Sequence, residues 1–250
     1  MLKLGKYENL LKYFGQIEKG DSIEYQSKYP ELYVDNDYEY EEITNKKICY
    51  LTFDDGPYAA NTTKILDTLK KYDAHATFFV VYNDTEDGRA LLKRMAKEGH
   101  TIGVHTASHD YEKIYSSVDE YLNDFEKVSN WIEEVIGKKP EIFRFPGGSI
   151  NSYNIGNYQS IISEMLRRGY TYYDWNCDSG DAAASYITKA NIVKNVSNTG
   201  NVDNKIVLMH DGQGHGETAK AVGPIIKRLK KSGYEFRALD KTVKPARFDY

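Results

Sequence analysis

The sequence predicts an α/β fold in which a parallel sheet is covered by helices and closed as a barrel. β-prone runs alternate with helix-like segments, and no run of hairpin signals interrupts them. Polar side chains follow the carboxyl ends of several predicted strands, the edge where barrels and open α/β sheets build their active sites, and this placement favours the barrel. With 250 residues, 40% apolar and 28% charged, the chain is long enough for one large core.

Residues 1–46 are polar and irregular, with a short helix expected near residues 7–14, and we predict an N-terminal extension or linker there. From Lys47 the alternating pattern continues to the end, which predicts a single domain over residues 47–250. The expected strands are 48–53, 76–81, 100–104, 142–145, 170–175, 205–209 and 234–237. The expected helices are 61–72, 88–98, 117–137, 158–168, 190–198 and 218–231.

Local signals mark several helix ends. Asn61 is a candidate N-cap for the first helix of the domain, and Ser117 opens a capping box with Glu120. Gly99 and Gly137 are typical of helix stops. These signals support the assignment of helices between the strands.

Composition excludes several classes of protein. The net charge is −4 and no basic run occurs, which argues against nucleic acid as a partner. No apolar stretch approaches the ~18 residues that cross a membrane, and the polar amphipathic start is not a signal peptide. Cys49 and Cys177 lie in apolar strand-like runs, where we expect small buried hydrophobes rather than a disulfide or a metal site.

Two adjacent acids, Asp54 and Asp55, end the first strand at a Gly-Pro turn. Asp is a poor strand former and neighbouring like charges repel, so the pair suggests a function, although alone it also fits an ordinary turn. His105 and His109 lie at i and i+4, so on a helical turn they would face the same way and bind one metal. One carboxylate with two imidazoles leaves coordination positions open, and zinc or another divalent first-row metal suits this set.

A hydrolytic metal site also needs proton-transfer groups. One carboxylate of the pair can hold the ion while the other takes a proton from water. His210, after a predicted strand, is the natural proton donor because imidazole titrates near neutral pH. Arg144 can orient a carboxylate and keep it ionised. Each of these residues alone would more often be structural.

The motifs TFDDGP, HTASH, RFPGG, DSGD and LMH occur in that order between Lys47 and Leu239. Together they resemble the motifs of the polysaccharide deacetylases, carbohydrate esterase family 4, also called the NodB-homology domain. The resemblance implies a distorted (β/α)7-8 barrel with an N-terminal extension, residues 47–250 being the catalytic domain. It also implies removal of N-acetyl groups from amino sugars with a divalent metal, usually Zn²⁺, with Co²⁺ or Ni²⁺ as alternatives.

The resemblance assigns roles by position. It implies that Asp54 is the general base, that Asp55, His105 and His109 hold the metal, and that Arg144 positions the base. The implied reaction polarises the acetamide carbonyl at the metal, and a water deprotonated by the base attacks it.

The remaining roles follow from the later motifs. The resemblance implies that His210 is the general acid and that Asp181 supports the charged catalytic pair, with Asp174 the less favoured candidate. A backbone N–H near Gly147 would help to hold the oxyanion. The implied substrate-binding residues are Pro146, Gly147, Trp175 and Leu208.

The sequence departs from the family pattern at two positions. Gly147 stands where members commonly carry Tyr, and Ala182 stands where they commonly carry Trp. Both changes remove aromatic bulk that would wall the cleft beside the acetyl group. Trp175, Tyr153 and Tyr173 are candidates to compensate.

The leading hypothesis is an N-deacetylase of N-acetylglucosamine or N-acetylmuramic acid in peptidoglycan or a related polysaccharide. The alternatives are an O-acetyl esterase on xylan-like polymers and a catalytically silent carbohydrate-binding version of the fold. By resemblance we expect a monomer that works outside the cell or at the envelope, with an export segment upstream of this chain.

Overall fold

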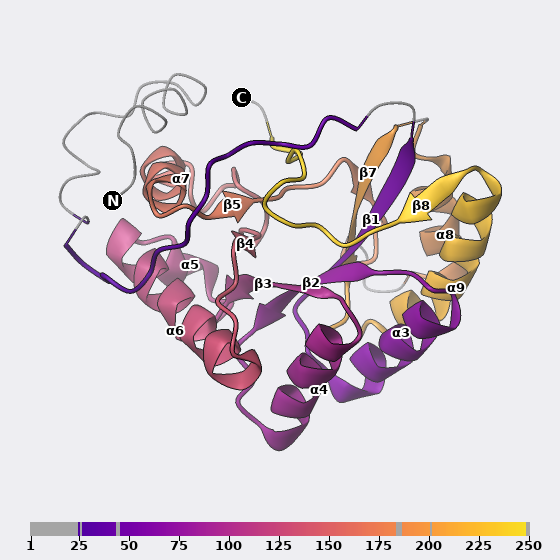
Figure 1. Ribbon diagram of the computed structural model, residues 1–250, viewed down its shortest axis with the longest axis horizontal. Coiled ribbons are helices and arrows are strands. Elements are labelled where there is room, and N and C mark those ends of the chain that lie inside the picture. The colour runs from indigo at the N-terminus through magenta and orange to yellow at the C-terminus, as the bar shows by residue number, and fades with distance from the viewer. Residues whose placement is uncertain (1–24, 26, 44–45, 184–186, 201, 249–250) are drawn as a thin grey trace.

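A computed structural model describes residues 25, 27–43, 46–183, 187–200 and 202–248; the helix expected near residues 7–14 lies outside them. The described strands form one parallel sheet in the order β5-β4-β3-β2-β1-β7-β6, with β8 also paired to β1 (Figure 1). Their bounds are Lys47–Asp54 (β1), Ala76–Val81 (β2), Thr101–Thr106 (β3), Ile142–Phe143 (β4), Thr171–Tyr172 (β5), Cys177–Asp178 (β6), Asn204–His210 (β7) and Tyr234–Phe236 (β8).

The sheet curls around β1 as an incomplete barrel. β8 pairs with the first half of β1, where Lys47 lies opposite Tyr234, and β2 pairs with the second half, where Leu51 lies opposite Ala76. Among the described residues, the outer strands β5 and β6 do not pair with each other. The expected distorted barrel is confirmed as a curled sheet that stays open between these two strands.

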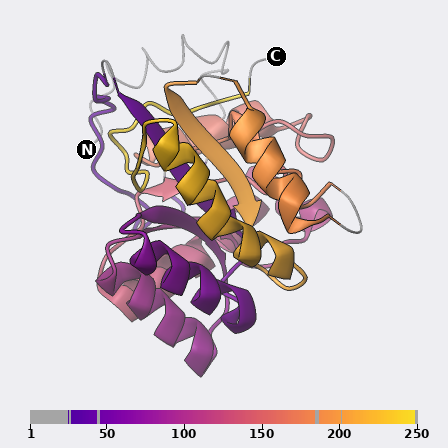
Figure 2. The ribbon, with the colours of Figure 1, turned by 90° about the vertical axis from the view of Figure 1, so that its right-hand side faces the viewer.

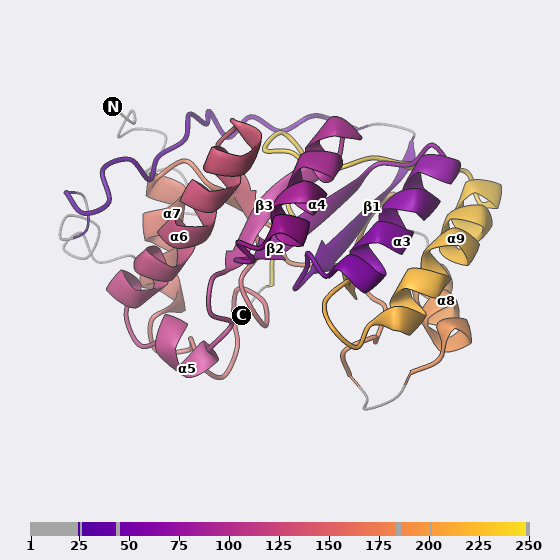
Figure 3. The same cartoon turned by 90° about the horizontal axis from the view of Figure 1, so that it is seen from below.

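Helices cover the outer side of the sheet. Figure 3 shows α6, α4, α3 and α9 side by side across it, and Figure 2 shows α8 and α9 in front of β7. Among the described helices, none is both long enough and apolar enough to cross a bilayer. The helix bounds are Ala59–Lys71 (α3), Glu86–Lys97 (α4), Tyr111–Ile114 (α5), Val118–Ile136 (α6), Tyr158–Arg167 (α7), Lys189–Asn198 (α8) and Gly216–Lys231 (α9).

β1 supplies side chains to two apolar clusters because successive side chains of a strand point to opposite faces. Cys49, Leu51 and Phe53 belong to the large cluster beneath the helices. Ile48 and Tyr50 belong to a smaller cluster inside the curl. The same alternation assigns Thr52 and Asp54 to the inner face. β1 therefore contributes to both apolar clusters and also places the Asp54 side chain inside the curled sheet.

Most predicted elements are present, with corrections at their ends. Ser117 caps α6 as expected, its hydroxyl accepting the Glu120 N–H at 3.1 Å. The prediction of Asn61 as an N-cap is wrong: Asn61 lies inside α3, and its side-chain amide donates to the Gly212 carbonyl at 2.7 Å. The short β6 and α5 were not predicted, because neither is long enough to show a periodic pattern.

Residues 27–43, here called the strap, lie along α7 and β5 before the chain enters β1 (Figure 1). The Val34 N–H donates to the Arg168 carbonyl at 3.0 Å, and the Glu41 N–H donates to the Thr242 carbonyl at 2.8 Å. The domain boundary at residue 46 stays a prediction, but the described part of the extension packs against the domain.

Candidate active site

The two adjacent acids diverge at the end of β1. Asp54 is its last residue and is buried, and its side chain accepts a hydrogen bond from Arg144 at 3.0 Å. Asp55 has a left-handed backbone, with φ of 72°, and its carboxylate instead faces two imidazoles. The expectation that neighbouring carboxylates point to different places is confirmed.

His105 and His109 converge on Asp55 Oδ1, with their Nε2 atoms 3.4 and 3.1 Å from it. The predicted helical turn is wrong: His105 lies in β3, and His109 lies in the following loop with a left-handed φ of 53°. The strand end and the backbone reversal bring the rings together, their centroids 5.4 Å apart.

Asp124 of α6 holds the loop between the two histidines. Its carboxylate accepts the Thr106 hydroxyl and the Ala107 N–H, both at 2.6 Å, and the Ser108 N–H at 2.9 Å. Sequence reasoning missed Asp124, because one acid on an amphipathic helix is typical of a solvated face. Its acceptor oxygens satisfy donors that the loop would otherwise leave unpaired.

Asp55, His105 and His109 fit a divalent metal. Their candidate ligand atoms all lie within 4.8 Å of one another. Asp55 Oδ1 is buried without a hydrogen-bond partner in the described structure, which is costly for a carboxylate unless a cation sits against it. His105 Nδ1 lies 2.9 Å from the Arg144 carbonyl, so this nitrogen can donate to it and leave Nε2 free to bind an ion.

The histidine contacts also lower the pKa of Asp55. Burial by itself would raise this pKa, but the nearby imidazoles of His105 and His109 outweigh it. The carboxylate is therefore ionised at neutral pH, the state that a metal ligand requires.

Arg144 is fully buried inside the curl and joins several strands. Besides Asp54, its guanidinium donates to the Thr52 hydroxyl at 2.5 Å and to the Tyr173 carbonyl at 2.8 Å. A fixed guanidinium at 3.0 Å restricts the rotation of the Asp54 side chain. This geometry fits the expected positioning role.

Asp181, buried after β6, pairs with His210, which is half-buried at the end of β7. His210 Nδ1 lies 2.7 Å from Asp181 Oδ1, and the His210 N–H donates to Asp181 Oδ2 at 2.8 Å. Burial alone would lower the pKa of His210, but the hydrogen bond and charge of Asp181 raise it to about 9. His210 therefore carries a proton at neutral pH.

The alternative acid, Asp174, has other partners. Its carboxylate accepts the Ser149 N–H at 2.8 Å, the Ser149 hydroxyl at 2.6 Å and the Phe248 N–H at 2.8 Å. The structure therefore brings Asp181, and not Asp174, to His210. Sequence reasoning missed His215, whose ring stacks on His210 at 5.1 Å and whose Nδ1 lies 3.7 Å from Asp181 Oδ2.

Asp211 packs against the Gly-Pro turn that follows Asp54 and Asp55, and sequence reasoning gave it no role. It is fully buried, accepts the Thr62 hydroxyl at 2.5 Å, and its N–H donates to the Asp54 carbonyl at 3.0 Å. A Cβ on Gly56 would lie 2.3 Å from both carboxylate oxygens, so only glycine fits there. The Gly-Pro turn is thus fixed from β7.

The expected substrate-binding residues differ in their exposure to solvent. Gly147 is exposed, while Pro146 and Leu208 are buried and Trp175 is half-buried, with its ring 5.8 Å from the Arg144 guanidinium. Among the candidates to compensate for lost aromatics, Tyr173 is fully buried, and its hydroxyl donates to backbone carbonyls, so it belongs to the core. Tyr153 is 54% exposed.

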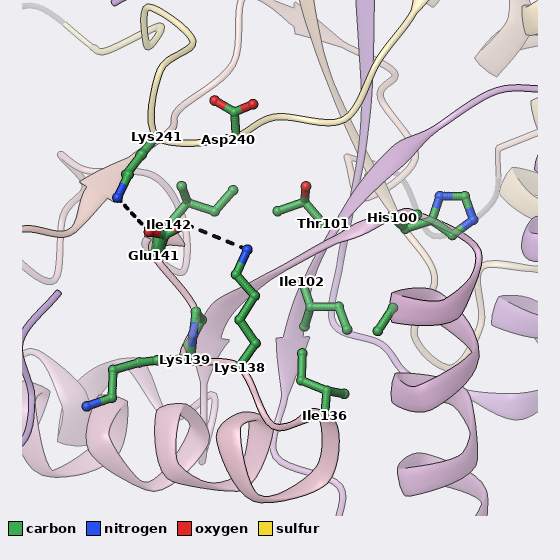
Figure 4. A pocket seen from close by; sticks show the side chains of 13 residues that line it. His100, Thr101, Ile102, Ile136, Lys138, Lys139, Glu141, Ile142, Asp240 and Lys241 are labelled. Carbon is green, nitrogen blue, oxygen red and sulfur yellow. Dashed lines mark hydrogen bonds and ion pairs between the residues drawn. The ribbon is translucent and has the colours of Figure 1, made fainter. Parts of the chain in front are cut away.

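A pocket of about 310 Å³ lies away from this site (Figure 4). It opens beside Thr101 and Ile142, the first residues of β3 and β4, whereas His105 lies near the other end of β3. Glu141 in this pocket pairs with Lys241 at 2.7 Å and with Lys138 at 3.8 Å. The pocket is therefore separate from the candidate active site.

The chain is similar to known polysaccharide deacetylases. The family model described as polysaccharide deacetylase matches residues 41–161. A peptidoglycan-N-acetylglucosamine deacetylase of Bacillus cereus is 36% identical over 197 residues, 77% of this chain and 69% of the relative. The peptidoglycan-N-acetylmuramic acid deacetylase PdaC of Bacillus subtilis is 36% identical over 191 residues, 76% of this chain and 38% of the relative.

A solved structure agrees with the sequence comparison. The catalytic domain of a peptidoglycan N-acetylglucosamine deacetylase from Eubacterium rectale superposes with a TM-score of 0.78 and 35% identity. The match covers 88% of this chain and 98% of that structure. The similarity therefore extends over nearly the whole of that catalytic domain.

Proposed function

Because the chain belongs to the polysaccharide deacetylase family, carbohydrate esterase family 4, we propose that it is a zinc-dependent N-deacetylase of peptidoglycan. Its substrate would be an N-acetylglucosamine or N-acetylmuramic acid residue, and acetate would be released. The observation that carries the proposal is the convergence of a two-histidine, one-aspartate ligand set with a separately held acid, Asp54, and a protonated imidazole, His210.

In this proposal Asp55, His105 and His109 hold Zn²⁺, which when bound polarises the acetamide carbonyl and acidifies water. Asp54 takes the proton from the attacking water, and the hydrogen bond from Arg144 holds its carboxylate in place. The strand end thus supplies a base and a ligand from adjacent residues.

The second half of the reaction, the release of the amine, depends on residues at and near the end of β7. His210 gives its proton to the amine nitrogen as the C–N bond breaks, and Asp181 keeps the imidazole charged and oriented. We assign the Gly147 N–H to the oxyanion, because Gly147 is exposed and left-handed, with φ of 75°.

The test is acetate release from chitooligosaccharides and from peptidoglycan fragments, with the product sugar identified by mass spectrometry. We expect Asp54→Asn to lower kcat at least 100-fold while the protein still binds Zn²⁺, since loss of a general base costs roughly 10²–10⁴. Asp178→Asn, an exposed acid of the DSGD motif, is the matched control. Full activity of Asp54→Asn, or activity that survives chelation, would contradict the proposal.

Acetylated xylan assayed in parallel separates the esterase alternative, and glycan binding without turnover would support the silent module. We also propose that the protein acts as a monomer, outside the cell or at the envelope. The named activity of its relatives on peptidoglycan supports this location.

A further inference from the structure

The start of α5 places an aromatic ring directly over Gly147. A Cβ built on Gly147 would lie 2.8 Å from Tyr111 Cε1 and 3.4 Å from its hydroxyl oxygen. A Cβ at the shorter distance would require the Tyr111 ring to move, so the ring occupies the space that a larger residue at position 147 would need. Both this contact and the left-handed φ of 75° favour glycine at position 147.

Tyr111 also contacts the metal-ligand set and an exposed aromatic. Its ring lies edge-on to the imidazole of His109, at 5.3 Å and 83°, and it meets the ring of Tyr153 at 5.2 Å. Tyr153 is 54% exposed, and Tyr111 is half-buried. Tyr111 packs against the core on one side, whereas Tyr153 extends the aromatic surface beside the metal-ligand set into solvent.

We propose that Tyr111 and Tyr153, here called the tyrosine wall, bind the apolar face of the sugar that carries the reacting acetamide or of its neighbour. This inference rests on the proposed deacetylase function. Sugar rings present patches of C–H groups, and tyrosine offers a large rigid apolar surface with a polar tip at low entropic cost. The wall supplies, from the start of α5 and from Tyr153, the aromatic surface that position 147 lacks.

The first test compares a long and a short substrate of the zinc-loaded protein. Tyr111→Ala is expected to raise KM for chitotetraose about tenfold while changing KM for 4-nitrophenyl acetate less than twofold, since the small ester cannot reach the wall. Tyr111→Phe keeps the ring and should recover most of the loss. Tyr72→Ala removes a half-buried tyrosine at the end of α3, before β2 begins, and should leave both KM values unchanged.

The second test uses the close approach of the two positions. Gly147→Ala should raise KM for chitotetraose by displacing the ring and by straining a left-handed backbone, and in a Tyr111→Ala background only the strain should remain, so the effect should be smaller. Strictly additive effects would overturn the proposal. Equal losses on the ester and on chitotetraose in Tyr111→Ala would overturn it as well, since Tyr111 would then act through His109.

Binding separates this inference from the proposed function. Chitotetraose is titrated calorimetrically into Asp54→Asn protein with and without Tyr111→Ala. Tyr111-dependent binding in a protein whose parent releases no acetate would support the wall and reject the deacetylase. Acetate release by the parent with glycan affinity and KM indifferent to Tyr111 would reject the wall alone.

Discussion

At the scale of single residues, the buried Asp181 sets the charge state of the half-buried His210. Asp181 accepts hydrogen bonds from the ring and the backbone of His210 and also from Thr218 at 2.8 Å. These contacts lower the pKa of Asp181 although burial would raise it, and they raise that of His210. The imidazolium is therefore maintained by its partner and not by solvent.

Asp181→Asn should lower the pKa of His210 from about 9 toward its usual value near 6.5, because burial is then opposed only by the charges of Asp54 and Asp55. NMR titration of the chelated protein measures this, since a bound cation would itself shift the pKa. In the zinc-loaded enzyme the fall of kcat at alkaline pH, as His210 loses its proton, should move to lower pH.

Asp178→Asn is the control for this titration, because in the described part of the chain the Asp178 side chain accepts the Gly180 N–H and has no hydrogen bond with His210. An unchanged pKa of His210 in Asp181→Asn would show that the pair does not govern the proton. It would also remove the reason for treating Asp181 as a positioning residue.

At the scale of elements, the strap is joined to α7 by a buried arginine. The Arg168 guanidinium is fully buried and pairs with Glu164 at 2.8 Å. It also donates at 2.8–3.3 Å to strap and neighbouring carbonyls, those of Tyr25, Lys28, Tyr29 and Leu32. Carbonyl groups of the strap thus accept hydrogen bonds from the buried guanidinium of Arg168, a residue of the catalytic domain.

Arg168→Ala should lower the free energy of unfolding by about 3–5 kcal/mol, since it removes one partner of a buried ion pair and leaves strap carbonyls unpaired. Urea denaturation followed by circular dichroism measures this. Arg89→Ala, which breaks a more exposed ion pair with Asp84, should change stability little. A loss below about 1 kcal/mol for Arg168→Ala would contradict the inference that the contacts between Arg168 and the strap stabilise the fold.

At the scale of the whole molecule, the metal ligands join the first and third strands of the domain. Asp55 follows β1, His105 lies near the end of β3, and Asp124 of α6 fixes the loop that follows β3. An ion that binds only this folded arrangement stabilises the entire chain by mass action. Metal affinity and global stability are therefore linked.

Zn²⁺ at about 100 times its Kd should raise the free energy of unfolding by roughly 2.7 kcal/mol, and chelation should remove the gain. Thermal unfolding with and without Zn²⁺ measures the shift in Tm. His109→Ala should lose the zinc-dependent shift, whereas His75→Ala, a histidine before β2 outside the ligand set, should keep it. An equal shift in both variants would place the ion elsewhere.

Much of this architecture could be predicted from local pattern. Alternating strands and helices, the Ser117 capping box and the polar residues after each strand are short-range signals, so the α/β class and the site edge follow from them. Asn61 and the His105–His109 turn were misread for the same reason. Each has a familiar local interpretation that a distant contact overrides, Gly212 for Asn61 and Asp55 for the histidines.

The sequence by itself determined which chemical groups this protein carries and at which sheet edge they meet, because strand period and strand ends are local properties of the chain. Only the tertiary structure decided the partners. Asp181 instead of Asp174 meets His210, Asp124 holds the histidine loop, and Tyr111 fills the space over Gly147. These pairings join residues from different elements, and their distances depend on how the sheet curls and how the helices pack on it.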